Sequence, residues 1–400
     1  MRVLNQRAVL DRLRRGGPAT RPQIAKDTGL SKPTVGQALL DLEQHRLVRP
    51  IGRTTAGPGR SAMVYEVNPA AGHVLGVDIG RQRIRVAVAD LAGSVIARVD
   101  ERNRCRTAGA LVRTVRDLAV RTVSDAGLSL DEMVVKVVGT PGVPRDRTLL
   151  HAPNLPGWER PGLLDELETL LGPDLVVEND ANLAAVGERA YGAARGVDVF
   201  VHVTVGTGIG MGIVVDGQLF RGAHGAAGEV GYLPYPSDVD STGGAGAVGG
   251  AGGVGAAGSA GGVGSSRGRL ESAVAAEAVV EAARSAGLGV KSARDVFALA
   301  RGGDPKALDV VRDEAERLAF VVASVAAVID PELVVLGGGI GGNTDLLGPP
   351  LAEALGRLTP LAPRIAAGEL GDGAVLSGAV AMGLAAARDL VFDRRGAVTL

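Results

Sequence analysis

Apolar side chains recur at helical spacing near the start of the chain. Val9, Leu10 and Leu13 share one face of a predicted helix, which is ended by Gly16-Gly17-Pro18. Thr20 is of a residue type that favours helix N-caps, so a second helix is predicted to begin there. Two short helices in close succession are therefore expected before residue 30.

A third helix is predicted to open at Ser31, with Pro33 tolerated in its first turn. Its inward face is defined by four apolar residues at i, i+3, i+4 and i+7, which are Val35, Ala38, Leu39 and Leu42. Two short apolar stretches, 47–48 and 63–65, predict strands that flank a wing with Gly59-Arg60 at its tip. Three helices followed by such a hairpin indicate a winged helix-turn-helix domain.

Polar residues remain exposed at the amino-terminal end of the third helix once its apolar face is turned inward. In winged heads this end of the recognition helix meets base edges and phosphates. The predicted DNA contacts are Ser31, Lys32, Pro33, Thr34 and Gln37, together with Arg60 at the wing tip. A small helical module that binds another protein is the alternative interpretation.

Charge is distributed unevenly along the chain. Residues 1–70 carry 12 Lys+Arg and 5 Asp+Glu, a net charge of +7, whereas the remaining residues carry a net charge of −8. A basic head on an acidic body indicates that only the head meets a polyanion. This asymmetry favours double-stranded DNA as the partner of the head.

Composition argues against several other classes of protein. The single cysteine, Cys105, excludes a disulfide framework and a cysteine-rich zinc site. Charges recur from Arg2 to Arg15, so the amino terminus has no signal-peptide pattern. The longest apolar run, residues 318–329, is too short to cross a bilayer. We therefore expect a cytoplasmic protein with no membrane partner.

Beyond residue 73 the pattern changes to short apolar strands. Three strands, a helix and a further strand are predicted at 74–80, 84–90, 95–99, 108–126 and 134–138. The second half repeats this order, with strands at 199–205, 209–215 and 218–220, helices at 270–286 and 307–329, and a strand at 333–336. Two copies of one α/β unit imply two lobes with a cleft between them, the usual place for a small ligand.

Domain limits follow from these repeats. We expect the winged head at 1–70, a first lobe at 71–190 and a second lobe at 191–375, with a helix near 376–395 returning to the first lobe. Inside the second lobe lies the stretch 241–266, in which 12 of 26 residues are glycine. That composition cannot hold a packed core and predicts a flexible loop.

Two candidate chemical motifs follow each other between residues 175 and 212. The apolar strand 175–177 leads into Asp180, at the position where open α/β sheets place ligands. Its carboxylate is suited to accept a proton from a hydroxyl, the role of a general base in sugar phosphorylation. The turn Gly206–Gly210 lets backbone N–H groups approach phosphate oxygens.

Each motif also has a purely structural interpretation. Asp180 is equally suited to cap the helix that follows it, and the glycines to form a tight hairpin. Taken singly, neither motif decides between the two interpretations. Their succession in one stretch favours a binding site.

The chain resembles the ROK family of repressors and sugar kinases, and within it the branch of xylose and N-acetylglucosamine repressors. In the head, the segments that carry the resemblance are Gly29-Leu30-Ser31-Lys32-Pro33-Thr34-Val35 and Gly59-Arg60. In the body they are Asn154-Leu155-Pro156-Gly157-Trp158, Glu178-Asn179-Asp180-Ala181-Asn182, Gly206-Thr207-Gly208-Ile209-Gly210, Gly228-Glu229-Val230-Gly231 and Asp330-Pro331. The resemblance implies a winged head joined to an actin-like, two-lobed sugar-kinase body, a duplicated ribonuclease H-like fold.

The resemblance also implies roles for individual residues. Asn154, Asn179, Asp180 and Glu229 would bind sugar hydroxyls, and Asp180 would be the base in a member that is a kinase. Tyr232 and Glu271 stand where the family has further sugar- and zinc-site residues. The residues that would face phosphates or an adenosine are Gly80, Gly206, Thr207, Gly208, Gly210, Gly337 and Gly338.

Three departures from the family pattern bear on the activity. The first phosphate loop of the family reads Asp-x-Gly-Gly-Thr, but here Gly80 is followed by Arg81 and Gln82. Tyr232 replaces a histidine that contacts sugar and zinc, and the glycine- and alanine-rich stretch replaces the cysteine cluster. We therefore expect neither zinc nor ATP as a cofactor.

Three functions remain open at this point. The favoured one is a sugar-responsive DNA-binding regulator without kinase activity, acting as a homodimer or tetramer on an operator. The second is an ATP-dependent hexose kinase with an added DNA-binding head. The third is a regulator whose body serves only for dimerisation.

Overall fold

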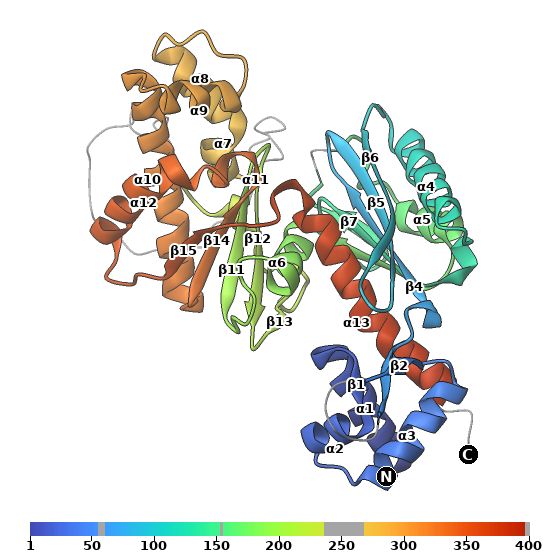
Figure 1. Cartoon of the computed structure of the whole chain (residues 1–400). Helices are drawn as coiled ribbons and strands as arrows, with labels where there is room; N and C mark the ends of the chain where they lie inside the picture. The colour runs from blue at the N-terminus through green and yellow to red at the C-terminus, as the bar shows by residue number, and fades with distance from the viewer. Residues whose placement is uncertain (55–60, 153–154, 236–267, 397–400) are drawn as a thin grey trace, which may run out of the picture. The chain divides into compact units, whose positions relative to one another are not determined.

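The computed structural model describes residues 1–54, 61–152, 155–235 and 268–396 (Figure 1). Contacts divide it into two compact units. The first comprises Met1–Pro141, Leu155–Asp180 and Leu376–Leu400, and the second comprises Gly142–Asn154 and Ala181–Val375. Arg60, Asn154 and the predicted loop 241–266 lie outside the described residues.

The head of the first unit contains the three helices and the hairpin that the sequence predicts. The helices are α1 (Arg2–Gly16), α2 (Arg21–Thr28) and α3 (Lys32–Gln44). The strands are β1 (Ala19–Thr20), β2 (Val48–Arg53) and β3 (Met63–Val67), in the order β1-β3-β2. The four predicted inward residues of α3 are all buried, none more than 3% exposed. The winged helix-turn-helix prediction is thus confirmed in its described elements.

Local caps explain where these helices begin and end. The backbone N–H of Thr34 donates to the Ser31 hydroxyl at 3.2 Å, so Ser31 caps α3 as predicted. At α2, the Gln23 side chain accepts from the backbone N–H of Thr20 at 2.8 Å. Gly29 ends α2 with φ of +71°, a left-handed conformation that favours glycine. The sharp turn between α2 and α3 follows from these two ends.

The body of the first unit is one mixed sheet covered by helices on both faces (Figure 1). Its strands are β4 (His73–Ile79), β5 (Arg83–Asp90), β6 (Val95–Arg102), β7 (Met133–Thr140) and β10 (Leu175–Asn179), in the order β10-β7-β4-β5-β6. The helices are α4 (Ala108–Asp125), α5 (Leu163–Leu171) and α13 (Ala374–Gly396). Strands β4, β7 and β10 are parallel, so their carboxyl ends share one edge of the sheet.

Helix α13 packs on this sheet at glycine positions. A Cβ on Gly76 of β4 would lie 3.0 Å from Val380, and one on Gly383 would lie 3.3 Å from Val137. Within the described residues, one segment, Gly371–Arg394, is long and apolar enough to span a membrane. Half of its most apolar window is buried in the protein, so its apolar residues serve the packing of the unit.

The second unit repeats the connectivity of the first. Its sheet contains β11 (Phe200–Val205), β12 (Ile209–Val215), β13 (Gln218–Leu219), β14 (Leu333–Gly337) and β15 (Arg364–Ala367), in the order β13-β12-β11-β14-β15. In both sheets a three-stranded antiparallel meander is followed by two parallel strands. The duplicated α/β architecture predicted from the sequence is therefore present.

The second unit also holds several helices and a hairpin, and only some of them are predicted from the sequence. Its helices are α6 (Asp180–Tyr191, whose first residue ends the first unit), α7 (Arg269–Val274), α8 (Ala276–Ser285), α9 (Ala293–Arg301), α10 (Pro305–Ile329), α11 (Gly338–Gly341) and α12 (Thr344–Leu358). The hairpin is formed by β8 (Val143–Arg145) and β9 (Thr148–Leu150). Helices α9 and α12, strand β15 and this hairpin were not predicted, nor was α5 in the first unit.

One predicted helix is wrong in its extent. The stretch 270–286 was expected to be continuous, but it is broken between α7 and α8 at Ala275, whose ψ is 160°. The backbone N–H of Ala276 donates to the carbonyl oxygen of Gly206 at 2.8 Å. This bond to the glycine turn replaces a bond within the helix, so the chain changes direction there.

A buried carboxylate ties the head helices together. Asp41 of α3 is 2% exposed, and it accepts from Arg2 at 2.7 and 2.8 Å, from Gln6 at 2.8 Å and from Gln37 at 2.9 Å. The hydrogen bonds from Arg2 hold the pKa of Asp41 well below its usual range. Its contribution to stability is therefore present at neutral pH and is lost only in strong acid.

We predict that Asp41→Asn lowers the free energy of unfolding at pH 7 by about 1–3 kcal/mol, because the amide nitrogen cannot accept the hydrogen bonds made to one of the two carboxylate oxygens. Urea unfolding followed by circular dichroism measures the change. Glu43→Gln, on the same helix, removes one charge but no hydrogen bond and should stay within about 0.5 kcal/mol of the wild type. Equal stabilities for the two variants would contradict this account of Asp41.

Candidate functional site

The amino-terminal end of α3 presents the predicted DNA-binding residues. Ser31, Lys32, Pro33 and Gln37 are exposed, and Thr34 is half-buried. Thr34 shares a hydrogen bond of 2.7 Å with the Ser31 hydroxyl, and the Gln37 amide donates to Asp41. Lys32 therefore offers an exposed positive charge on this surface with no ion-pair partner among the described residues, while the polar groups around it are held in fixed positions.

The head is also bonded to the last helix of the first unit. Arg7 of α1 pairs with Asp389 of α13 at 2.5 Å and lies over the Phe392 ring at 5.6 Å. The Arg14 guanidinium donates to the carbonyl oxygen of Arg388 at 3.0 Å. The sequence analysis did not identify these contacts, since residues so distant in sequence carry no local signal.

Asn179 and Asp180 stand at the carboxyl edge of the first sheet. Asn179 ends β10, and Asp180 is the first residue of α6, where the helix dipole favours a negative charge. Asp180 is half-buried, and the backbone N–H of Asn179 donates to the Glu178 carboxylate at 2.9 Å. A half-buried carboxylate at this edge is suited to accept a hydrogen bond from a sugar hydroxyl.

The remaining predicted effector residues lie in the second unit. Glu229 precedes the short 3₁₀ turn Val230–Tyr232, which packs on α7, the helix that carries Glu271. A Cβ on Gly231 would lie 3.6 Å from a carboxylate oxygen of Glu271, which is 9% exposed. Glu229, Tyr232 and Glu271 are thus neighbours through these two elements.

Tyr232 has a partner that the sequence analysis did not identify. Its hydroxyl lies 3.3 Å from Nδ1 of His151, and the two rings meet edge to face with centroids 5.3 Å apart. The chain therefore places an imidazole beside the tyrosine from another segment, the loop after β9. Among the described residues, no group of three His, Cys, Asp or Glu side chains is arranged to hold a metal ion.

The predicted glycine positions of the second unit come together at the carboxyl edge of its sheet. Gly206 and Thr207 follow β11, and Gly338 follows β14, which is paired with β11 in parallel. A Cβ on Gly206 would lie 3.7 Å from the backbone nitrogen of Gly339. Gly338, with φ of +80°, would clash with Val205 if it carried a side chain. Two backbone turns therefore lie side by side, as a phosphate cradle requires.

Close packing explains other glycines of the turn region. Gly208 lies within the turn, where its carbonyl accepts from the backbone N–H of Gly206 at 2.9 Å. A Cβ on Gly210 would lie 3.0 Å from Ala181, and Gly212 faces the same helix. Gly337 leaves room for His202, whose pKa is lowered to about 4 by burial. His202 is therefore neutral, and it too was not identified from the sequence.

At the end of β4, the first unit departs from an open phosphate loop. Gly80 closes a tight turn by donating to the carbonyl oxygen of Arg83 at 2.9 Å, and Arg81 and Gln82 are exposed. Asp78 is 4% exposed and accepts from Arg85 at 2.8 Å. The two residues face each other in the register of β4 and β5, which is the signal by which sequence reasoning could have found the pair.

Burial dominates the titration of Asp78. It raises the pKa of the carboxyl to about 6, while the hydrogen bond from Arg85 acts in the opposite direction. The charge of Asp180 raises the pKa of Asp78 further, which places both carboxylates in one electrostatic environment. The first unit thus holds Asp180 beside an ion pair rather than beside an unpaired carboxylate.

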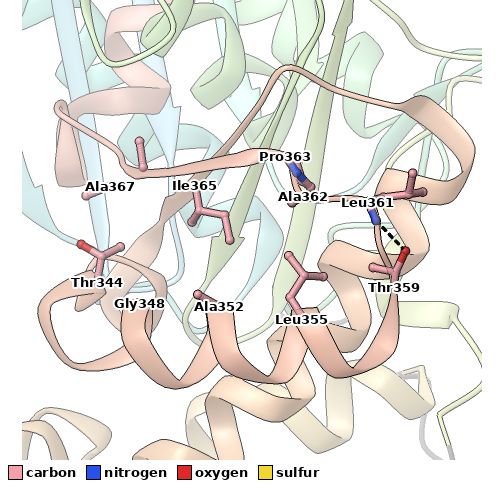
Figure 2. A pocket seen from close by; sticks show the side chains of 12 residues that line it. Thr344, Gly348, Ala352, Leu355, Thr359, Leu361, Ala362, Pro363, Ile365 and Ala367 are labelled. Carbon is pink, nitrogen blue, oxygen red and sulfur yellow. Dashed lines mark hydrogen bonds between the residues drawn. The ribbon is translucent and has the colours of Figure 1, made fainter.

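A separate cavity of about 430 Å³ lies between α12 and β15 (Figure 2). Small and apolar residues line it, among them Gly348, Ala352, Leu355 and Ile365. Its hydroxyl groups come from two threonines at its ends, and the Thr359 hydroxyl already accepts from the backbone of the following loop at 3.1 Å. Without a charged side chain the cavity is poorly suited to a sugar or a phosphate.

Comparison with known proteins matches both parts of the chain. Residues 74–386 match the model of the ROK family, and residues 7–52 match the IclR helix-turn-helix domain. A glucokinase of Halalkalibacterium halodurans is 33% identical over 296 residues, covering 70% of this chain and 84% of that protein. A xylose repressor of Caldicellulosiruptor bescii is 26% identical over 391 residues, covering 96% of each chain.

Among solved structures, a ROK family transcriptional regulator described as a homolog of the E. coli MLC protein aligns with a TM-score of 0.74. It is 21% identical and covers 98% of each chain, so it supports the fold. The repressor and this regulator both match the chain from head to body, whereas the glucokinase matches 70% of it.

The raised pKa of Asp78 yields a pH prediction. A carboxyl with a folded pKa near 6 and an ordinary value of 3.8 stabilises the fold at low pH, and this stabilisation is lost as pH rises through about 6. Relative to Asp78→Asn, the wild type should lose about 1.4 kcal/mol of unfolding free energy per pH unit between about pH 4 and 6. Urea titrations across this range measure it.

Asp117→Asn is the control, because Asp117 is exposed and pairs only with the neighbouring Arg116. The difference in unfolding free energy between Asp117→Asn and the wild type should not change between about pH 4 and 6 in the way that the difference for Asp78→Asn does. A flat difference for Asp78→Asn as well would contradict the assignment of a buried, protonatable carboxyl.

Proposed function

The chain belongs to the ROK family and carries an IclR-type helix-turn-helix at its amino terminus, and from this premise we propose that it is a transcriptional repressor that responds to a sugar and has no kinase activity. Residues 1–70 form the DNA-binding domain, 71–190 with the helix near 376–395 the first lobe, and 191–375 the second. It acts as a homodimer or tetramer in the cytoplasm, without zinc or ATP.

The ion pair between Asp78 and Arg85 is the observation that best supports the proposed absence of kinase activity. Phosphoryl transfer depends on positioning and on charge stabilisation around the phosphates and their metal ion. A carboxylate with one oxygen bonded to a guanidinium has its charge offset and is a weaker ligand for a hydrated Mg²⁺. In the same loop, Arg81 stands where a family kinase has a glycine that lets backbone approach phosphate.

Sugar recognition remains possible without this loop. Asp180, the first residue of α6, can still accept a hydrogen bond from a sugar hydroxyl, and the polar amide of Asn179 is adjacent to it in the chain. In the second unit, Glu229, Tyr232 and Glu271 supply further polar groups, with Tyr232 and His151 in place of one histidine. Asn154 joins this set by family resemblance. We propose these residues as the effector site.

Helix α13 can transmit a change at the proposed effector residues to the DNA-binding head. Helix α6 begins at Asp180, and its Glu188, fully buried, accepts the backbone N–H groups of Glu369 and Leu370 at 3.1 and 3.0 Å. Helix α13 begins shortly after, at Ala374, and ends in the contacts with α1 of the head. A ligand that shifts α6 would act on α13, and through it on the head.

A hexose kinase with a DNA-binding head is the second candidate, because the glucokinase has the higher identity, 33% against 26% for the xylose repressor. A body that serves only for dimerisation is the third. The sugar response separates these functions: a repressor responds to sugar without turnover, a kinase turns it over, and a dimerisation platform does neither.

We predict that D-xylose, D-glucose or N-acetylglucosamine changes operator affinity, and that Asp180→Asn weakens this response about tenfold or more because a hydroxyl acceptor is lost. Fluorescence anisotropy with labelled promoter DNA measures the affinity. Asp117→Asn, an exposed acid of the same unit, is the control and should respond like the wild type. An ADP-release assay with the same sugars and saturating ATP should stay at background.

Turnover near the ~10 per second of a working enzyme, abolished in Asp180→Asn, would establish the kinase instead. No response to any sugar, with intact operator binding, would favour the dimerisation body.

We also predict that Lys32→Gln weakens operator binding and lowers the slope of log affinity against log salt by about one, because one phosphate contact is lost. Lys291→Gln removes an exposed charge from the second unit and should leave the slope unchanged. Salt titrations of the same anisotropy signal give both slopes. Undiminished operator binding by a chain lacking residues 1–70 would refute the role of the head.

A further inference from the structure

The turn between β4 and β5 is joined to the end of β6 by one asparagine. Asn103 donates from its side chain to the carbonyl oxygen of Gly80 at 3.0 Å and from its backbone to that of Gln82 at 2.8 Å. These two acceptors flank Arg81, and Arg102 and Arg104 flank Asn103. Three arginines are therefore held in one neighbourhood by two hydrogen bonds.

The guanidinium groups of these three arginines are unused within the described residues. Arg81, Arg102 and Arg104 are all exposed, and none forms an ion pair or a side-chain hydrogen bond with another described residue. Arg102 lies directly opposite Arg83 in the register of β5 and β6, an arrangement of like charges that opposes folding. A bound anion would relieve this repulsion.

Nearby acids do not neutralise the cluster. Asp100 accepts from Arg83 at 2.5 Å and from Arg85 at 3.3 Å. Asp78 is held by Arg85, and Glu101 pairs with Arg121 at 2.5 Å. Each nearby carboxylate therefore already has a cationic partner, while Arg81, Arg102 and Arg104 have none within residues 1–54, 61–152, 155–235 and 268–396.

A depression of about 470 Å³ opens at this place, lined by Arg83, Asp100, Glu101, Arg102 and Arg104. Its size suits a small anion with one or two phosphoryl groups. Arginine forks match phosphate oxygens with paired hydrogen bonds, which makes phosphate the anion of choice over a halide or a single carboxylate.

We propose that Arg102 and Arg104, which line the depression, and Arg81 of the adjacent turn form a binding site for the phosphoryl group of a small phosphorylated ligand. The guanidinium groups replace the backbone amides on which a glycine phosphate loop depends. Operator DNA bound by the same head is a poor candidate, because seven residues of β4, about 20 Å of strand, separate the turn from the strand's start at the head. None of the three arginines belongs to the proposed effector set, so this site can be tested separately from the sugar response.

The test titrates pyrophosphate into the full chain by isothermal calorimetry at constant ionic strength. The wild type should bind it, and the double variant R102Q/R104Q should bind about tenfold more weakly or worse. R98Q/R113Q is the matched control, because Arg98 and Arg113 are also exposed and form no ion pair with a described residue, but lie outside the depression. R102K/R104K keeps the positive charges but lacks the forked guanidinium groups, so its affinity for pyrophosphate should lie between those of the wild type and R102Q/R104Q.

Two outcomes would overturn the proposal: no binding of pyrophosphate to the wild type, or an equal loss of affinity in R98Q/R113Q. A selective loss of operator affinity in R102Q/R104Q would also overturn it, by assigning the arginines to DNA. Binding of pyrophosphate by a chain that binds no sugar would leave this site standing while the proposed sugar response fails.

Further arms identify the source of the phosphoryl group. Glucose 6-phosphate that binds more tightly than glucose in the wild type, but not in R102Q/R104Q, would place the phosphate on the effector itself. Pyrophosphate and glucose bound together, each with unchanged affinity, would indicate a second ligand. Either result supports the site.

Discussion

Parallel strands bring their carboxyl ends to one edge of a sheet, and the chemistry of both units depends on this constraint. In the first unit β4, β7 and β10 are parallel, so Asp78 near the end of β4, Gly80 just after it and Asp180 after β10 lie at the same edge of the sheet. In the second unit the parallel pair β11 and β14 brings the turns at Gly206 and Gly338 together. Residues far apart in sequence become neighbours because the hydrogen-bonded register of the parallel strands fixes where each strand ends.

Charge at the edge of the first unit explains why a kinase-like body need not be a kinase. Asp78 is buried beside Asp180, and two unpaired carboxylates there would repel each other. The guanidinium of Arg85 resolves this repulsion, but it also occupies the carboxylate. The same fold can therefore keep a hydroxyl acceptor at Asp180 while giving up the charge arrangement that phosphate transfer needs. Recognition and catalysis are separable in such a body because they depend on different residues of one edge.

Strong local periodicity made the head, the two meanders and the first residues of α6 predictable from the sequence. The Asp78–Arg85 pair was not identified, although the short β4–β5 turn already fixes the register that sets it. Helix α12 was missed because it contains Pro349 and Pro350, which usually end helices; Leu347 and Leu351 on either side are fully buried and hold it in place. Tyr232 and His151 come from distant segments, so their contact depends on tertiary packing alone.

We propose that sugar and operator bind to one chain and that each changes the affinity of the chain for the other. Equilibrium linkage requires the influence to be reciprocal: if sugar changes operator affinity by some factor, operator must change sugar affinity by the same factor. Calorimetric titration of D-xylose and D-glucose, with and without saturating operator DNA, measures this directly. A sugar that changes operator affinity should have different dissociation constants with and without saturating operator DNA. Identical constants for a sugar that binds would contradict it.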